Sequence, residues 1–151
     1  MIKGNDLIQS IRSCQKGDDR IVFWWLGQLG YVIKLAGCTI YADPYLSNNP
    51  KRLYPPLLDA EQITDADIIL GTHDHEDHID YPAWKAIAKA SPQAVFVLPE
   101  LFKKKISREL DIPEERLIGM DDGRSCTVKG VTIYGIAAAH ELLDQDPATG
   151  M

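Results

Sequence analysis

The sequence predicts an α/β fold in which helices cover one face of a mixed β-sheet. Three observations lead to this expectation. Short segments rich in β-branched and aromatic residues follow one another near the N-terminus, which predicts an antiparallel meander. Further short apolar segments then alternate with segments of helical periodicity, which predicts β–α–β–α–β. The length of 151 residues and the hydrophobic content of 45% suit one domain with a sizeable buried core.

A helix and the antiparallel meander are predicted first. Asn5 or Asp6 can cap the helix, and Gly17 can end it. The apolar side of this helix would consist of Leu7, Ile8, Ile11 and Cys14. Ala36-Gly37 is expected to form a tight hairpin turn inside the meander. The three strands of the meander would cover residues 21–26, 31–35 and 38–42.

The remaining elements follow a proline-rich loop at residues 44–62. Loops of this length inside compact domains are usually functional or mobile. Asp80 can cap a helix that continues to about Ala90. Three short apolar strands and a second helix are expected around it, the strands at residues 67–71, 94–98 and 116–118 and the helix at 99–110. A final hairpin is predicted across Lys129-Gly130.

Two groups of side chains invite a functional interpretation, which has to be weighed against a structural one. Trp24 and Trp25 could stack on a substrate, but their place in an apolar strand favours packing for both. The run Lys103, Lys104 and Lys105 could form a basic patch, but exposed charge runs are usually a solvated helix face. The sequence therefore assigns no binding role to either group.

The composition narrows the classes of partner and compartment. A formal net charge of -6 and a pI near 5.1 disfavour a nucleic-acid backbone as the main partner. The three cysteines are widely spaced and form neither a disulfide framework nor a C-x-x-C zinc motif. The N-terminus is too polar for a signal peptide, and no apolar stretch has the length of a membrane span. We expect a cytoplasmic protein with a small-molecule substrate.

The residues that carry chemistry are concentrated in one short segment. Three of the four histidines and three acidic residues lie in T-H-D-H-E-D-H, residues 72–78. In an extended chain, residues two apart point the same way, so His73 and His75 can face one cation. Asp77 and His78 follow where the chain must turn, and they can face a second cation. The spacing therefore predicts a metal site with two neighbouring positions.

The types of ligand suggest which ions would bind. Imidazole and carboxylate groups suit zinc, manganese or iron, and we expect two divalent ions, with zinc favoured. Two ions roughly 3.5–4 Å apart can share a bridging water and lower its pKa toward neutrality. His140, just past an apolar strand, would add a third imidazole to His73 and His75. The alternative, a solvated loop without metal, is disfavoured because unpaired polar groups are costly to bury.

Asp43 has two interpretations. Its carboxylate can accept a hydrogen bond from the second ring nitrogen of one metal-binding imidazole. Equally, an aspartate directly before Pro44 is common as a turn residue. The sequence does not decide between the two.

The H-x-H-x-D-H pattern at residues 73–78 resembles the signature of the metallo-β-lactamase superfamily. The words W-W-L-G (24–27) and Y-A-D-P (41–44) are similar to the branch of metal-dependent hydrolases that includes the L-ascorbate 6-phosphate lactonase. The resemblance covers essentially the whole chain. It implies that the predicted α/β fold is one half of an αββα sandwich, a mixed sheet with helices on one face.

The resemblance also implies roles for the candidate ligands. The first ion would be held by residues matching His73, His75 and His140, and the second by residues matching Asp77 and His78. Asp77 would in addition orient the attacking water and so be the catalytic residue. The family also uses a bridging aspartate and a further histidine from its second half, for which residues 1–151 offer no counterpart. We therefore expect a single domain, incomplete at its C-terminal end, that a homo-oligomeric partner or a missing C-terminal half would complete.

The leading hypothesis for function is a metal-dependent hydrolase in which a metal-bound hydroxide attacks an ester-like bond. The resemblance implies a lactone or a sugar-phosphate-type substrate. Two alternatives stay open. One is a nucleic-acid-processing phosphodiesterase of the same fold, which the acidic charge disfavours. The other is a non-catalytic metal-binding fragment that needs a partner chain.

Overall fold

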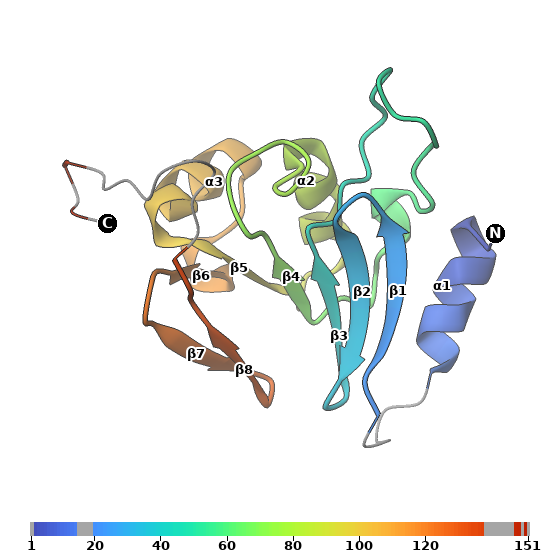
Figure 1. Cartoon of the computed structure of the whole chain (residues 1–151), viewed down its shortest axis with the longest axis horizontal. Coiled ribbons are helices and arrows are strands. Elements are labelled where there is room, and N and C mark those ends of the chain that lie inside the picture. The colour runs from blue at the N-terminus through green and yellow to red at the C-terminus, as the bar shows by residue number, and fades with distance from the viewer. Residues whose placement is uncertain (1, 15–19, 138–146, 149, 151) are drawn as a thin grey trace.

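The computed structural model describes residues 2–14, 20–137, 147–148 and 150, and its centre is one mixed β-sheet (Figure 1). Within these residues, six strands form the sheet in the order β1-β2-β3-β4-β5-β6. The strands are β1 (Val22–Gly27), β2 (Gly30–Leu35), β3 (Cys38–Ala42), β4 (Ile68–Leu70), β5 (Val95–Pro99) and β6 (Leu117–Met120). The first three strands pair antiparallel, and β3 to β6 pair parallel. The predicted meander followed by parallel strands is confirmed.

Three α-helices lie in the described part of the chain, and all three pack on the same face of the sheet. They are α1 (Gly4–Ser13), α2 (Tyr81–Ala90) and α3 (Lys103–Leu110), accompanied by the short 3-10 helices η1 (Ala60–Gln62), η2 (Glu100–Phe102) and η3 (Glu114–Arg116). The main core joins Ile11, Trp84 and Ile106 of the helices to Ile69 and Phe96 of the strands. This arrangement confirms the expectation of helices on one face.

A two-stranded hairpin covers part of the opposite face of the sheet. It consists of β7 (Ser125–Val128) and β8 (Val131–Tyr134), drawn in orange and red in Figure 1. Val128 and Val131 pack in a second core with Ile68 of β4. At the turn of the hairpin, the Lys129 ammonium donates to Asp67 Oδ1 at 2.8 Å. Ile68 and Ile69 therefore belong to two different cores, as the continuous apolar run of this strand predicted.

Strand β1 and the residue before it leave apolar side chains exposed on the face that the helices do not cover. Ile21, Phe23 and Trp25 are each more than 60% exposed, at 62%, 66% and 62%. The prediction that both tryptophans are packed is wrong for Trp25. Side chains alternate along a strand, so only Trp24 points to the helix side, where its indole N–H donates to Ser10 Oγ at 3.2 Å.

The start of α1 differs from the sequence expectation. The helix begins at Gly4 with Lys3 as N-cap, so Asn5 and Asp6 lie in its first turn instead of capping it. A tertiary contact takes the place of a side-chain cap, because the Gly4 N–H donates to the carbonyl of Leu57 at 2.7 Å. The helix also ends at Ser13, before the expected stop at Gly17, which lies outside the described residues.

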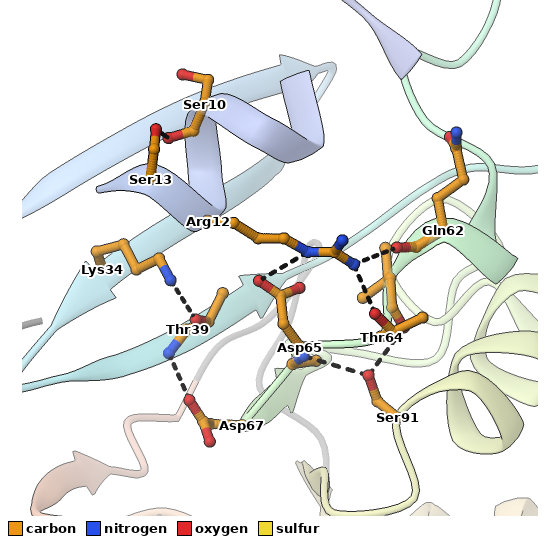
Figure 2. Close-up of polar contacts among 12 residues, drawn as sticks. Ser10, Arg12, Ser13, Lys34, Thr39, Gln62, Thr64, Asp65, Asp67 and Ser91 are labelled. Carbon is orange, nitrogen blue, oxygen red and sulfur yellow. Dashed lines mark hydrogen bonds and ion pairs between the residues drawn. The ribbon is translucent and has the colours of Figure 1, made fainter. Parts of the chain in front are cut away.

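A group of polar contacts fastens α1 to the amino-terminal side of β4 (Figure 2). Arg12 donates to Thr64 Oγ1 at 2.6 Å, and its Nε lies 3.9 Å from Asp65 Oδ2. The buried Tyr41 hydroxyl donates to the same carboxylate at 3.5 Å, and burial raises the pKa of Tyr41. The opposite end of the parallel strands, where β3, β4 and β5 finish, is left for the loops that carry the candidate site.

The ends of α2 are fixed as the sequence suggested. Asp80 accepts a hydrogen bond from the Ala83 N–H at 3.2 Å, so it is the predicted N-cap. At the other end, the Arg116 guanidinium donates to the carbonyls of Ala88, Ser91 and Ala94 at 2.8–3.0 Å. The helix predicted over 99–110 differs in two ways. Pro99 is the last residue of β5, and the residues after it form the 3-10 helix η2 followed by α3. No helix of the described ranges is long and apolar enough to cross a membrane.

Two phenylalanines test which face of the sheet carries the stability. We expect Phe96→Ala, at a fully buried position, to lower the free energy of unfolding by about 3–5 kcal/mol. Phe23→Ala should cost only about 0.5–1.5 kcal/mol, because the exposed Phe23 makes one edge contact with Tyr31. Urea unfolding monitored by circular dichroism measures both values. Equal losses in the two variants would contradict the assignment of the core.

Candidate metal centre

The loop of residues 71–80 joins β4 to α2 at the edge where the parallel strands end. Its first residue is held to the sheet, because the Gly71 N–H donates to the Val97 carbonyl at 2.9 Å. Its last residue, Asp80, is buried and also accepts hydrogen bonds from the backbone N–H groups of Leu46 and Ser47, at 2.8 and 2.7 Å. The loop is therefore anchored at both ends and fastened to the neighbouring loop after β3.

Between these anchors the chain makes a turn at His75. The backbone N–H groups of His78 and Ile79 both donate to the His75 carbonyl, at 3.0 and 2.9 Å. The turn places the His78 side chain in the interior, where the residue is 6% exposed. His73 and Asp77 are half-buried, and His75 is exposed. The four candidate ligands of the segment therefore range from the interior to the surface of one turn.

Asp43 is the buried residue on which the inner part of the site depends. Its Oδ1 accepts the Thr72 N–H at 2.8 Å, and its Oδ2 accepts the Thr72 hydroxyl at 2.9 Å. Oδ2 also lies 2.8 Å from His78 Nδ1. The residue has a positive φ of 44°, directly before Pro44, a conformation that costs a non-glycine residue about 1–3 kcal/mol. Asp43 thus occupies the turn and also hydrogen-bonds an imidazole, so its two interpretations are compatible.

The carboxylate of Asp43 determines the tautomer of His78. An ionised carboxylate only accepts hydrogen bonds, so the proton of the neutral imidazole resides on Nδ1. The lone pair of Nε2 is then available, and Nε2 lies 3.9 Å from Asp77 Oδ2. Two ligand atoms that each sit about 2.0–2.1 Å from one zinc ion can be no more than about 4 Å apart. The separation of His78 and Asp77 is within that limit but wider than the roughly 3.3 Å between ligands of a tetrahedral zinc ion, so the two side chains would have to approach each other to share an ion.

His73 and His75 form a second pair. His73 Nε2 lies 3.1 Å from His75 Nδ1, and the two ring centroids are 4.6 Å apart. Ligand nitrogens around a tetrahedral zinc ion are separated by about 3.3 Å, so this spacing suits a shared ion. Burial and the neighbouring His78 and His75 lower the pKa of His73, which favours the neutral form that binds metal.

The three histidine rings of the loop lie together, since the ring centroid of His73 is 4.6 Å from that of His75 and 3.8 Å from that of His78. Within residues 2–14, 20–137, 147–148 and 150, no three His, Cys, Asp or Glu side chains surround a point where a metal ion would fit. The predicted third imidazole, His140, lies outside the described residues. The donor types and the spacing of His73 and His75 fit a divalent cation, and each pair requires further ligands to complete a coordination sphere.

The sequence did not predict the contacts of Thr72 or the ion pair between Lys105 and Asp74. Thr72 links the inner residues, because its hydroxyl lies 3.2 Å from His73 Nδ1 and 3.0 Å from His78 Nδ1. Lys105 is 44% exposed, as expected for a solvated helix face, and it also donates to Asp74 Oδ2 at 3.0 Å. Only Thr72 carried a usable signal, its position next to the histidine cluster. The partner of Lys105 is 31 positions away and could not be inferred.

A cavity of about 410 Å³ opens beside the loop. Asp74 and Glu76 line it on one side, and Tyr45 and Asn48 of the loop after β3 line it on another. It therefore borders the side of the loop that carries the acidic residues between the histidines. A polar ligand in this cavity would lie next to the candidate metal centre.

Comparison with known proteins places the chain among metal-dependent hydrolase relatives. A family model described as "Beta-lactamase superfamily domain" matches residues 23–150. A protein named metal-dependent hydrolase from Myxococcus xanthus is 36% identical over 124 residues, which are 79% of this chain and 38% of the relative. An N-acyl-phosphatidylethanolamine-hydrolyzing phospholipase D from Caenorhabditis elegans is 33% identical over 88 residues, 53% of this chain and 25% of the relative.

Solved structures are similar in fold at low sequence identity. A metallo hydrolase from Ignicoccus hospitalis superposes with a TM-score of 0.51 at 19% identity, over 71% of this chain and 42% of that chain. This chain spans between a quarter and about half of the length of the curated relatives it matches, from 25% to 52%. The similarities therefore concern one part of longer proteins.

The role of Asp43 can be tested by a change of one atom. Asp43→Asn places an amide NH₂ where an oxygen now faces His78, so we expect the ring proton of His78 to move from Nδ1 to Nε2. Nitrogen NMR of the imidazole rings reports this shift. Zinc affinity should fall roughly 10–100-fold, the usual effect of losing such a partner. Asp6→Asn, on the exposed side of α1, is the matched control and should change neither the imidazole signals nor the zinc affinity. If the ring proton of His78 stayed on Nδ1 in Asp43→Asn, the assignment would be contradicted.

Proposed function

Because this chain belongs to the β-lactamase superfamily, we propose that it supplies the metal-binding part of a hydrolase that cleaves an ester-like bond. The observation that carries the proposal is the Asp43–Thr72–His78 arrangement at the base of the H-x-H-x-D-H loop. Asp43 leaves the Nε2 lone pair of His78 available beside Asp77, and His73 and His75 are spaced as ligands of one ion. The longer relatives named metal-dependent hydrolases support the same chemistry.

In this proposal the histidines of the loop bind metal, and Asp77 also orients a water molecule. His73 and His75 would hold one divalent cation, with His140 as the proposed third imidazole, and His78 and Asp77 would hold a second. When bound, such cations make water acidic enough to act as a nucleophile near neutral pH. The half-exposed Asp77 carboxylate can accept a proton of that water and so direct its lone pair toward the substrate. Zinc is the favoured ion for this set, with manganese or iron as alternatives.

The partner of the exposed sheet face is part of the proposal. Ile21, Phe23 and Trp25 form an apolar surface that water does not favour. The relatives that this chain matches extend well beyond the matched segment. We propose that this face packs against further β structure, from additional polypeptide or from a second copy of the chain, and that the same unit supplies the remaining metal ligands.

Two substrate classes deserve direct comparison. The words W-W-L-G and Y-A-D-P resemble those of a lactonase branch, which favours a lactone or sugar-phosphate-type ester. The similarity to a phospholipase D favours a phosphodiester instead. A nucleic-acid phosphodiester is disfavoured by the net charge of -6. A non-catalytic metal-binding fragment remains the competing function, and the experiment below distinguishes it from an enzyme.

We expect elemental analysis of the purified protein to find about two divalent ions per chain once its partner structure is present. Hydrolysis of lactone, thioester and phosphodiester substrates should then be measured with and without a chelator. His75→Ala should lower kcat/KM by more than the roughly 10–100-fold typical of a lost outer ligand partner, because it removes a ligand itself. Its unfolding midpoint should stay near that of the wild type, since His75 is exposed. Full activity in folded, metal-depleted His75→Ala would refute the proposal, and metal binding without any hydrolysis would favour the non-catalytic fragment.

A further inference from the structure

Asp74 lies between the two histidines of the outer pair, and its side chain is held by two other elements. The Tyr81 hydroxyl, at the start of α2, donates to Asp74 Oδ1 at 3.0 Å. The Lys105 ammonium, in the first turn of α3, donates to Oδ2 at 3.0 Å. The Asp74 side chain is 15% exposed, whereas that of Lys105 is 44% exposed, so the carboxylate is the buried partner of the pair. One carboxylate therefore connects the loop to both helices.

These contacts restrain Asp74 more than a single surface ion pair would. Each carboxylate oxygen has its own donor, which fixes the rotation of the group as well as its position. Both donors come from helices that are packed in the core, and Lys105 is itself placed over the rings of Tyr81 and Phe102, 5.4 and 6.0 Å from their centroids. An ammonium–carboxylate contact is about twice as strong as a neutral hydrogen bond.

We propose that Asp74, held by Tyr81 and Lys105, is a positioning residue that fixes the orientation of His73 and His75. This inference rests on the proposed metal-binding function. Asp74 is bonded through its backbone to both histidines, so a displacement of this backbone would move both imidazoles away from their 3.1 Å approach. The contacts of the carboxylate with the two helices restrain that displacement.

The inner and outer ligands are thereby positioned by different means. Asp43 contacts the ring of His78 directly, at 2.8 Å. Asp74 makes its side-chain contacts with Tyr81 and Lys105, so it acts on the histidines through the backbone. Loss of the Asp74 contacts should therefore disturb His73 and His75 while His78 keeps its hydrogen bond to Asp43. This difference separates positioning from a general loss of structure.

The test uses matched lysines of α3. Lys105→Met removes the ammonium that holds Asp74, and Lys104→Met removes the same charge from an exposed neighbouring position. Lys105→Arg should preserve the ion pair with Asp74. Asp74→Asn should remove the negative charge while retaining an oxygen that accepts from the Tyr81 hydroxyl. The full chain is studied without metal by NMR of the histidine rings, and then with added zinc and with cobalt.

In the metal-free protein, we expect Lys105→Met and Asp74→Asn to shift the ring signals of His73 and His75 and to weaken the magnetisation transfer between these rings. The nitrogen signals of His78 should keep the pattern of an Nδ1-protonated ring, because Asp43 still accepts from it, and Lys104→Met and Lys105→Arg should resemble the wild type. Zinc affinity should fall roughly 10–100-fold in the first two variants, with an altered cobalt absorption spectrum.

The two proposals fail in different ways. If the wild type binds zinc and the Lys105→Met and Asp74→Asn variants bind it equally, with unchanged ring signals, the positioning role is overturned. If the wild type binds no zinc, the proposed function fails, and the ring signals alone decide on positioning. Loss of the Nδ1 proton of His78 in both variants would indicate a general structural effect and would also overturn it.

Discussion

The buried contact between Asp43 and His78 is the interaction on which the candidate site depends. It joins the residue after β3 to the loop after β4, and the same carboxylate receives both hydrogen-bond donors of Thr72. These contacts offset the strained backbone of Asp43 and the cost of burying its charge, which would be large without hydrogen-bond partners. The strain and the buried carboxylate are therefore explained by what they position, a histidine whose second ring nitrogen is available for a ligand.

The frame around this contact follows from the parallel arrangement of β3, β4 and β5. Parallel strands bring their carboxyl ends to one edge, so residues far apart in the sequence meet there. Packing below the loop is tight: a Cβ atom on Gly71 would lie 2.6 Å from Ile79 Cγ1 and 2.7 Å from Trp84 Cζ2. Any larger residue at Gly71 would displace the start of the loop or the N-terminal half of α2. The polar contacts of Arg12 and Asp65 at the other end of the sheet keep α1 in place without involving the site.

Local patterns in the sequence predicted much of this structure. Ala36-Gly37 predicted the hairpin because glycine favours tight turns, and both residues have positive φ in the structure. Asp80 predicted the start of α2 because capping is a short-range interaction. The H-x-H-x-D-H segment predicted which residues would be neighbours. The sequence failed where long-range contacts decide: Gly4 is capped by Leu57, and Lys105 finds Asp74 across the loop. Trp25 was assigned to the core because an apolar strand does not reveal which of its faces is covered.

The incomplete coordination and the open sheet face have a common physical meaning. Pairs of ligand atoms 3.1 and 3.9 Å apart can each supply two positions around an ion, and a catalytic zinc site needs at least three protein ligands. The helix side of the sheet is closed by α1, α2 and α3, whereas β1 presents Phe23 and Trp25 to solvent. A structure that covered this apolar face would gain the burial energy of large aromatic side chains. That energy could hold additional ligands at the edge of the sheet, so that metal binding and sheet packing would stabilise each other.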